Sequence, residues 1–243
     1  MIIVLFMSIL QVKNITKYLS GIKILDNVSF EVKAGEVYGF LWPNWAWKTT
    51  TMKCIMSLII PEEGNIKVLW QDWLNIKAKK EVWFMPENTY LYKYLKWREF
   101  LRFNWKFFWL SWDKLEKKID ELLKKVWLED AWDKYLYEYS KWMLQRIWLA
   151  QSIINNPKLL FLDEPMSWLD PIWRKQVKDL MVDLKNEGTT IFFNTHILAD
   201  VESICDKFSI IHHWKMIVES MKVSDLDKPL EEFFIQKVSD TTN

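Results

Sequence analysis

Glycine is the residue that this chain most conspicuously lacks. It occurs 5 times in 243 residues, whereas about 7% is usual in proteins. A folded chain needs glycine wherever the backbone takes a positive φ or passes close to a ligand. Tryptophan, in contrast, occurs 17 times. The shortage and the surplus are explained together if tryptophan stands at positions that call for glycine.

Cysteine is also scarce, with Cys54 and Cys205 far apart in the sequence. Their spacing excludes a disulfide framework and a zinc site, and it favours two buried thiols in a reducing compartment. The net charge of +1 and the absence of a basic patch exclude a nucleic-acid partner recognised by charge.

Long apolar runs are missing too. No stretch approaches the ~20 residues that cross a bilayer. Residues 1–10 are apolar but lack the basic start and the cleavage site of a signal peptide, so we expect an extension followed by a strand from about Ser8. The sequence therefore predicts a cytoplasmic protein with no span of its own.

The segment 42–50 carries the clearest motif. It reads Trp42, Pro43, Asn44, Trp45, Ala46, Trp47, Lys48, Thr49 and Thr50. With glycine at its three tryptophans it becomes G-P-N-G-A-G-K-T-T, a complete phosphate-binding P-loop. Backbone N–H groups would then receive the phosphates of ATP. Lys48 would pair with the β- and γ-phosphates and the Thr49 hydroxyl would bind Mg²⁺.

The same replacement repairs other turns, in residues 140–143, 167–171 and 213–215. Our hypothesis is that the gene comes from an organism that reads the codon UGA as glycine and was translated here with tryptophan. As written, three indoles would fill the space that the phosphates need, since each carries about 150–250 Å² of surface. The alternative is that the tryptophans are genuine and the loop has lost its nucleotide.

The order of expected elements indicates an α/β fold. We expect short strands at 9–13, 24–32, 36–41, 66–69 and 82–85, a helix at 48–58 and a helical region at 97–151. Strands at 158–162, 189–194 and 207–212 then alternate with helices at 171–186 and 197–204. Alternation of this kind predicts a mostly parallel sheet with helices on both faces.

An apolar strand ends in two acids, Asp163 and Glu164. Buried strands of such sheets deliver ligand-binding groups at their carboxyl ends. Asp163 is expected to hold Mg²⁺ directly or through water, and Glu164 to polarise an attacking water. Alone, the pair would more simply cap the following turn.

Together these motifs resemble the nucleotide-binding subunit of ATP-binding cassette (ABC) transporters over nearly the whole chain. The resemblance implies a P-loop NTPase core with a mostly parallel sheet, an N-terminal antiparallel β lobe and an inserted α-helical lobe at about 88–152. The ATPase domain would span 8–226, and 227–243 would be a short C-terminal tail.

The family's signature sequence corresponds here to Tyr139 followed by Ser140, Lys141, Trp142 and Met143. The form Tyr-Ser-Lys-Gly-Met resembles the subfamily that exports drugs, sodium and other small molecules. The resemblance implies that this serine and glycine contact the γ-phosphate bound to an opposite subunit, so that two cassettes clamp two ATP molecules. Ser140 also fits an ordinary helix N-cap.

Further positions match the family more weakly. Asp170 ends a D-loop that crosses the dimer interface, although a plain turn before Pro171 is also possible. His196 matches the switch histidine that reaches the γ-phosphate. Glu87 occupies the place where most members carry the Q-loop glutamine, which leaves its metal contact in doubt. Tyr18 matches the aromatic residue that stacks on adenine, and a core tyrosine is its alternative.

The resemblance implies ATP hydrolysis with Mg²⁺, in which Lys48, Glu164 and His196 are catalytic. It also implies a homodimer or a paired cassette, and an integral membrane permease contacted on the cytoplasmic face through residues 87–96, with Tyr90, Tyr92 and Tyr94 as candidate contacts. A soluble ABC ATPase acting on ribosomes or DNA is the alternative, disfavoured by the single cassette and the lack of a heptad run. If the tryptophans are genuine, a cassette without nucleotide is the other.

Overall fold

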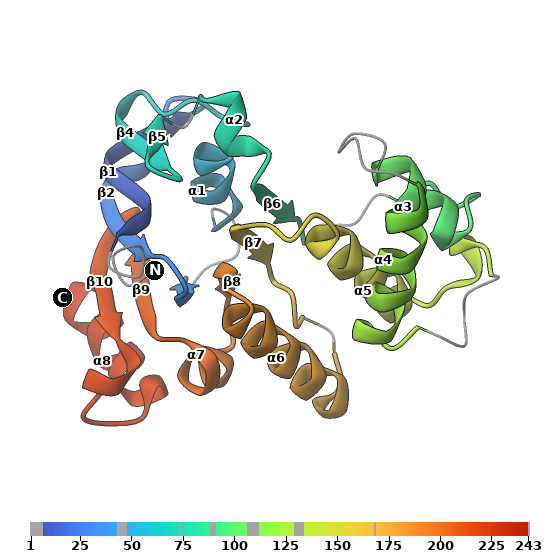
Figure 1. Ribbon diagram of the computed structural model, residues 1–243. Coiled ribbons are helices and arrows are strands. Elements are labelled where there is room, and N and C mark those ends of the chain that lie inside the picture. The colour runs from blue at the N-terminus through green and yellow to red at the C-terminus, as the bar shows by residue number, and fades with distance from the viewer. Residues whose placement is uncertain are drawn as a thin grey trace.

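A computed structural model describes residues 7–42, 48–72, 74–87, 91–105, 112–128, 134–167 and 169–242. Figure 1 shows a sheet-containing part and, to one side, a lobe built from α3, α4 and α5. The strands are β1 (Ser8–Leu19), β2 (Ile22–Lys33), β3 (Val37–Leu41), β4 (Glu63–Val68), β5 (Gln71–Asp72), β6 (Val82–Met85), β7 (Leu159–Asp163), β8 (Thr190–Thr195), β9 (Lys207–His212) and β10 (Lys215–Lys222). The α-helices are α1 (Lys48–Ile55), α2 (Ile76–Lys79), α3 (Trp97–Trp105), α4 (Trp112–Lys125), α5 (Lys141–Ile153), α6 (Pro171–Asn186), α7 (Leu198–Ile204) and α8 (Leu230–Thr242).

The larger sheet has the strand order β10-β9-β3-β8-β7-β6. Its strands are parallel except at β10, which pairs antiparallel with β9. Every residue of β3, β7 and β8 is buried, as expected for central strands covered on both faces. The predicted α/β fold with a mostly parallel sheet is confirmed, and the carboxyl ends of these strands meet at one edge.

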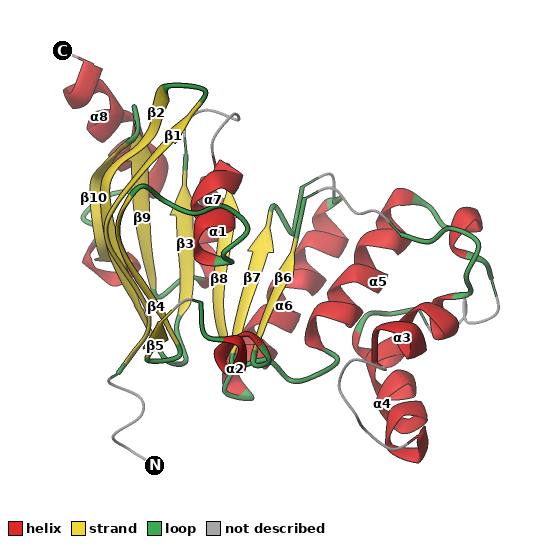
Figure 2. Cartoon of the chain, turned by 90° about the horizontal axis from the view of Figure 1, so that it is seen from above, coloured by secondary structure: helices red, strands yellow, loops and turns green. Residues whose placement is uncertain are grey.

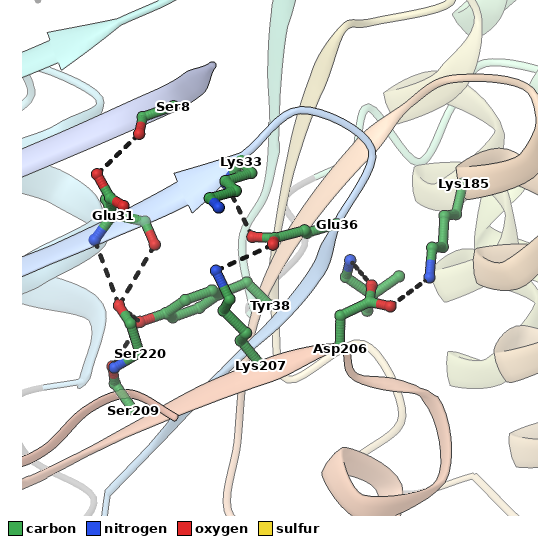
Figure 3. Close-up of polar contacts among 11 residues, drawn as sticks. Ser8, Glu31, Lys33, Glu36, Tyr38, Lys185, Asp206, Lys207, Ser209 and Ser220 are labelled. Carbon is green, nitrogen blue, oxygen red and sulfur yellow. Dashed lines mark hydrogen bonds and ion pairs between the residues drawn. The ribbon is translucent and has the colours of Figure 1, made fainter. Parts of the chain in front are cut away.

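The second sheet is the expected antiparallel lobe, with the order β2-β1-β4-β5, and it lies against the core sheet in Figure 2. The Phe30 ring of β2 packs on those of Tyr38, Phe40 and Phe192 in the core strands. A polar network borders this apolar contact (Figure 3), in which the Tyr38 hydroxyl lies 2.9 Å from Ser220 Oγ, itself bonded to the Glu31 carbonyl. Burial raises the pKa of Tyr38, so its hydroxyl stays protonated.

The helical lobe lies between β6 and β7 in the chain. Helix α4 buries one face, formed by Leu115, Ile119 and Leu122 at helical spacing, and Val126 directly after the helix is buried as well. Arg102 on α3 makes a two-pronged pair with Glu116 on α4, with bonds of 2.6 and 2.8 Å. The lobe therefore has its own buried apolar contact surface, with an ion pair beside it.

The structure differs from the sequence expectation at the first helix, at β5 and α2, which were not expected, and after residue 214. The first helix ends at Ile55 instead of residue 58, because Ser57 takes a φ of +57° and the Leu58 amide closes on the Lys53 carbonyl at 2.9 Å. The chain after residue 214, where no element was expected, forms β10 and α8. Leu230 and Phe233 of α8 are buried, so part of the stretch expected as a tail packs on the core.

Hairpin loops show directly which residue the turns prefer. Three described two-residue loops have positive φ at both positions: Ser20–Gly21, Leu69–Trp70 and His213–Trp214. Each connects directly paired strand ends. The second residue has φ of 79° at Gly21, 63° at Trp70 and 73° at Trp214. Such loops strongly favour glycine at this position, and the chain has it in one loop and tryptophan in the other two.

A helix end repeats this correspondence. After α6, Gly188 has a φ of +99°, its amide bonds to Lys185, and the next amide bonds to Leu184. After α4, Trp127 has a φ of +53°, with the same two bonds to Lys124 and Leu123. This C-terminal motif usually has glycine at the left-handed position. Trp127 therefore occupies the place that glycine fills in the matching motif of the same molecule.

Trp70→Gly is expected to raise the free energy of unfolding by about 1 kcal/mol, because it removes the cost of a side chain at positive φ. Its indole is 42% exposed, so little packing is lost. Chemical denaturation would measure the change. Gly21→Ala is the reciprocal control: a Cβ there meets nothing within 4 Å, and a loss of similar size is expected. Equal stability of all three chains would contradict the backbone argument.

Candidate functional site

The candidate site begins where three parallel strands end. In the sheet register Asp163 of β7 lies opposite Asn194 of β8, and Thr195 lies opposite Leu41 of β3. Helix α1 begins at Lys48, shortly after β3 ends. The topology therefore brings the two acids, the residues after β8 and the start of α1 to one edge, where ligands bind in open α/β sheets.

Asp163 is a buried carboxylate, with 1% of the residue exposed. Its Oδ1 accepts a hydrogen bond from Asn194 Nδ2 at 3.2 Å. A charged group at such a position needs polar partners or a cation. Its place at the strand end suits it to hold a cation at the sheet edge.

Glu164 is held from two sides. Its Oε1 lies 2.9 Å from Nδ1 of His196, and its Oε2 accepts a hydrogen bond from the Ser167 hydroxyl at 2.6 Å. Its φ of +51° turns the chain after β7, and its amide bonds to the Asn194 carbonyl at 3.1 Å. Glu164 and His196, chosen from separate motifs, are thus brought into contact.

Ser167 is the residue whose role sequence reasoning missed, because it was noted only as part of the D-loop motif. Its position three residues after Glu164 was the available signal, since a hydroxyl there can fold back across a turn. The Ser167 amide also bonds to the Glu164 carbonyl at 3.2 Å. This backbone hydrogen bond closes the turn after the strand, as in the capping alternative. Glu164 contacts His196 as well.

The phosphate-loop residues are only partly described. Pro43, Asn44, Trp45, Ala46 and Trp47 lie outside the described residues, as do the side chains of Lys48 and Thr49, whose backbone opens α1. Thr50 follows in the same helix and is buried.

Trp42 can be judged directly. Its side chain is 8% exposed and packs edge-on against Phe40, with ring centroids 5.7 Å apart. Its indole N–H is buried without a hydrogen-bond partner among the described atoms, and the same holds for Trp97 and Trp148. A buried donor left unsatisfied costs about 1–3 kcal/mol, a cost that glycine would not carry.

The signature and D-loop residues meet at a second place. Ser140, Trp142, Met143 and Asp170 line one open hollow of about 540 Å³, and Lys141 is exposed at the start of α5. Ser140 caps α5 by accepting from the Met143 amide at 3.3 Å, as its capping alternative predicted. Asp170 likewise caps α6, accepting from Ile172 and Trp173. The start of α5, with its uncharged serine cap, therefore faces this hollow and suits an anion, whereas the Asp170 carboxylate already occupies the start of α6.

The two remaining predicted residues lie apart from that hollow. Tyr18 is on β1 with 40% of its surface exposed, so it is not the core tyrosine of the alternative reading. Glu87 follows β6 and is half-buried.

The acidic edge fits magnesium and nucleotide by the chemistry of its donors. Mg²⁺ takes oxygen ligands, usually one or two from the protein with the rest from water and phosphate. Asp163 supplies a carboxylate there, and no group of three or more His, Cys, Asp or Glu residues among the described residues forms a complete metal cage. The arrangement thus suits a cation brought with phosphates.

No described helix combines the length and apolar composition needed to cross a membrane. This holds for the ranges given above.

Comparison with known proteins places the chain among nucleotide-binding subunits. The family model described as ABC transporter matches residues 25–167. An uncharacterized ABC transporter ATP-binding protein of Nostoc is 42% identical over 195 residues, covering 79% of this chain and 58% of the relative. The bacitracin transport ATP-binding protein BcrA of Bacillus licheniformis is 34% identical over 215 residues, covering 87% and 69%. The chain thus spans less than two thirds of the Nostoc relative.

A solved structure agrees in fold. The ATP-binding subunit of an ABC transporter superimposes with a TM-score of 0.86 at 27% identity, covering 95% of this chain and 99% of that one.

Proposed function

The chain belongs to the ABC transporter family, and from this membership we propose that it is the ATP-binding and ATP-hydrolysing subunit of an ABC transporter. The observation that carries the proposal is the contact of Glu164 with His196 at the sheet edge where α1 begins. A buried carboxylate held by an imidazole beside a phosphate-binding helix suits a group that activates water.

The residues would divide the work of hydrolysis as follows. Lys48 and the amides at the start of α1 would bind the β- and γ-phosphates. Thr49 and Asp163 would hold Mg²⁺, which supplies electrostatic stabilisation when bound. Glu164 would accept the proton of the attacking water while the water oxygen bonds to the γ-phosphorus. The bond between that phosphorus and ADP would break in the same step. His196 and Ser167 keep the Glu164 carboxylate in place for that transfer.

The proposal includes the identity of the tryptophans. We propose that the native protein has glycine at these positions, including 42, 45 and 47. The hairpins at Trp70 and Trp214 and the helix end at Trp127 support this replacement, since each has the positive φ that glycine tolerates best. The buried, unpartnered indole N–H of Trp42 supports it at the phosphate loop.

The hollow between Ser140 and Asp170 suits the proposed dimer. In a head-to-tail pair, a second copy or a related cassette would present its ATP to this hollow. Ser140 and the amides at the start of α5 would contact a phosphate there, and Tyr18 would stack on adenine in the first copy.

The partner outside the dimer would be an integral membrane permease on the cytoplasmic face. Tyr92 and Tyr94 expose 65% and 84% of their surface, and interfaces favour aromatic residues; Tyr90 lies outside the described residues. The segment bearing them bonds to the one before Ser140, through Leu136 to Leu95 and Tyr137 to Lys93 at 3.0 Å. The signature form favours an exporter, and the permease would select the substrate.

Purification from the native organism in a mild detergent is expected to recover this subunit together with an integral membrane protein. The physical reason is the exposed aromatic surface at Tyr92 and Tyr94, whose burial would stabilise the complex. Mass spectrometry of the purified complex would identify the partner. Replacing both tyrosines by serine should weaken recovery, whereas Tyr18→Ser should not. Recovery only with ribosomes or DNA would support the soluble ATPase instead.

A further inference from the structure

A buried lysine lies next to Tyr18 on β1. The Lys17 side chain is 10% exposed, and its Nζ donates to the Ile60 carbonyl and to Glu62 Oε1, both at 2.7 Å. A buried ammonium needs such partners to offset the loss of water. These bonds tie the end of β1 to residues 58–62, the connection between α1 and β4.

Glu62 extends this tie to Tyr18 itself. Its Oε2 accepts the Tyr18 backbone N–H at 2.9 Å, and its own amide donates to the Thr16 carbonyl at 3.0 Å. The pairing of β1 with β4 ends at Thr16 and Glu63, two residues before Tyr18. The Glu62 carboxylate therefore takes over as the acceptor where the strand partner stops.

The same carboxylate is kept ionised. Its hydrogen bond from Lys17 is the main cause that lowers the pKa of Glu62, and the bond from Tyr18 adds to it. A charged acceptor makes a stronger bond to a backbone N–H than a neutral one.

The connection leads directly to α1. Leu58 and Ile59 amides bond back to the Lys53 carbonyl in the last turn of that helix. Burial is the main cause that raises the pKa of the neighbouring Cys54 thiol to about 11. Lys17 lowers this pKa by a smaller amount, and Glu62 raises it. Lys17 and Glu62 are thus close to α1, the helix whose first turn is the proposed phosphate site.

We propose that Glu62, with Lys17, is a positioning residue for the nucleotide base: it fixes the backbone of Tyr18 relative to α1, so that the exposed ring can stack on a purine whose phosphates lie at the start of that helix. The proposal rests on the proposed function. Glu62 does not touch the nucleotide and acts only through Tyr18, whose ring is accessible.

The test compares two ligands in a chain with glycine at all seventeen tryptophan positions. Glu62→Ala should weaken MgATP binding about tenfold, the scale of one lost base–aromatic stack, and leave magnesium tripolyphosphate binding unchanged. Glu62→Gln keeps an acceptor oxygen and should recover part of the loss. Tyr18→Ala should give the same loss as Glu62→Ala, and the double variant no more than either. Equal weakening of both ligands would show a general structural role and overturn the proposal.

A second measurement needs no nucleotide. Hydrogen exchange at the Tyr18 amide should become about tenfold faster in Glu62→Ala, because the amide loses its acceptor. Glu63→Ala is the matched control, an exposed neighbour that pairs with Thr16 only through its backbone, and should leave that amide unchanged. An unchanged exchange rate in Glu62→Ala overturns the positioning role. A parent chain that binds neither ligand contradicts the proposed function instead.

Discussion

A chain with glycine at positions 42, 45 and 47 is expected to bind MgATP at least about 100-fold more tightly than the chain with tryptophan there. Three indoles would fill the space that the phosphates need, since each is large, and any left-handed position adds roughly 1–2 kcal/mol per side chain, where 1.4 kcal/mol is tenfold in affinity. Trp42 already packs inward on Phe40. Isothermal titration calorimetry would measure both affinities.

The sharpest control separates the loop from folding. It has glycine at the other fourteen positions and tryptophan only at 42, 45 and 47. It should fold, because glycine removes the cost of a side chain at positive φ in the hairpins and at the helix end at Trp127. It should not bind ATP. Equal binding by this control would refute the phosphate-loop argument.

The native residue can be read directly. Peptides from protein made in its own organism should show the mass of glycine at 42, 45 and 47. Tryptophan masses there would instead support a cassette that has lost its nucleotide.

Glu164→Gln, made in the glycine-containing chain, is expected to bind MgATP normally and to hydrolyse it about 10²–10⁴-fold more slowly. Glutamine preserves the shape and can still contact His196 and Ser167, but it cannot accept the proton of the attacking water. Stalled hydrolysis should also lengthen the lifetime of the proposed ATP-bound dimer. Phosphate release and size-exclusion chromatography in ATP would report the two effects.

Lys48→Ala is the matched comparison, because it should weaken ATP binding itself. Ser167→Ala should keep binding and lower turnover less than Glu164→Gln, since it removes one of two supports of the carboxylate. Normal turnover in Glu164→Gln would show that another group activates water.

The sequence alone was sufficient for much of the fold. The apolar residues within 36–41 and 158–162 indicated central strands, and these residues are fully buried in β3 and β7. Pro171 after Asp170 marked a helix start, and α6 spans the predicted 171–186. Such local signals work because burial and capping depend on residue types that are close in the chain.

Two elements after residue 214, β10 and α8, were not predicted from the sequence. Buried and exposed residues alternate only weakly along β10. The strand is stabilised by pairing with β9 and by the contact of Ser220 with Tyr38 and Glu31. Helix α8 lies beyond the last recognised motif, and its Leu230 and Phe233 are buried. The contacts of Ser220 join residues that lie 182 and 189 positions apart in the sequence, so no local pattern revealed them.

The sequence by itself predicted which residues carry the chemistry: the P-loop pattern, the acids after an apolar strand and the histidine after another. Only the tertiary structure decided that Glu164 and His196 touch, that Ser167 holds the other carboxylate oxygen, and that Glu62 reaches Tyr18. The reason is that the register between strands and positive-φ turns set these contacts, and a linear pattern contains neither. The same backbone angles showed which tryptophans take the positive φ that glycine favours, because φ becomes known only once the chain is folded.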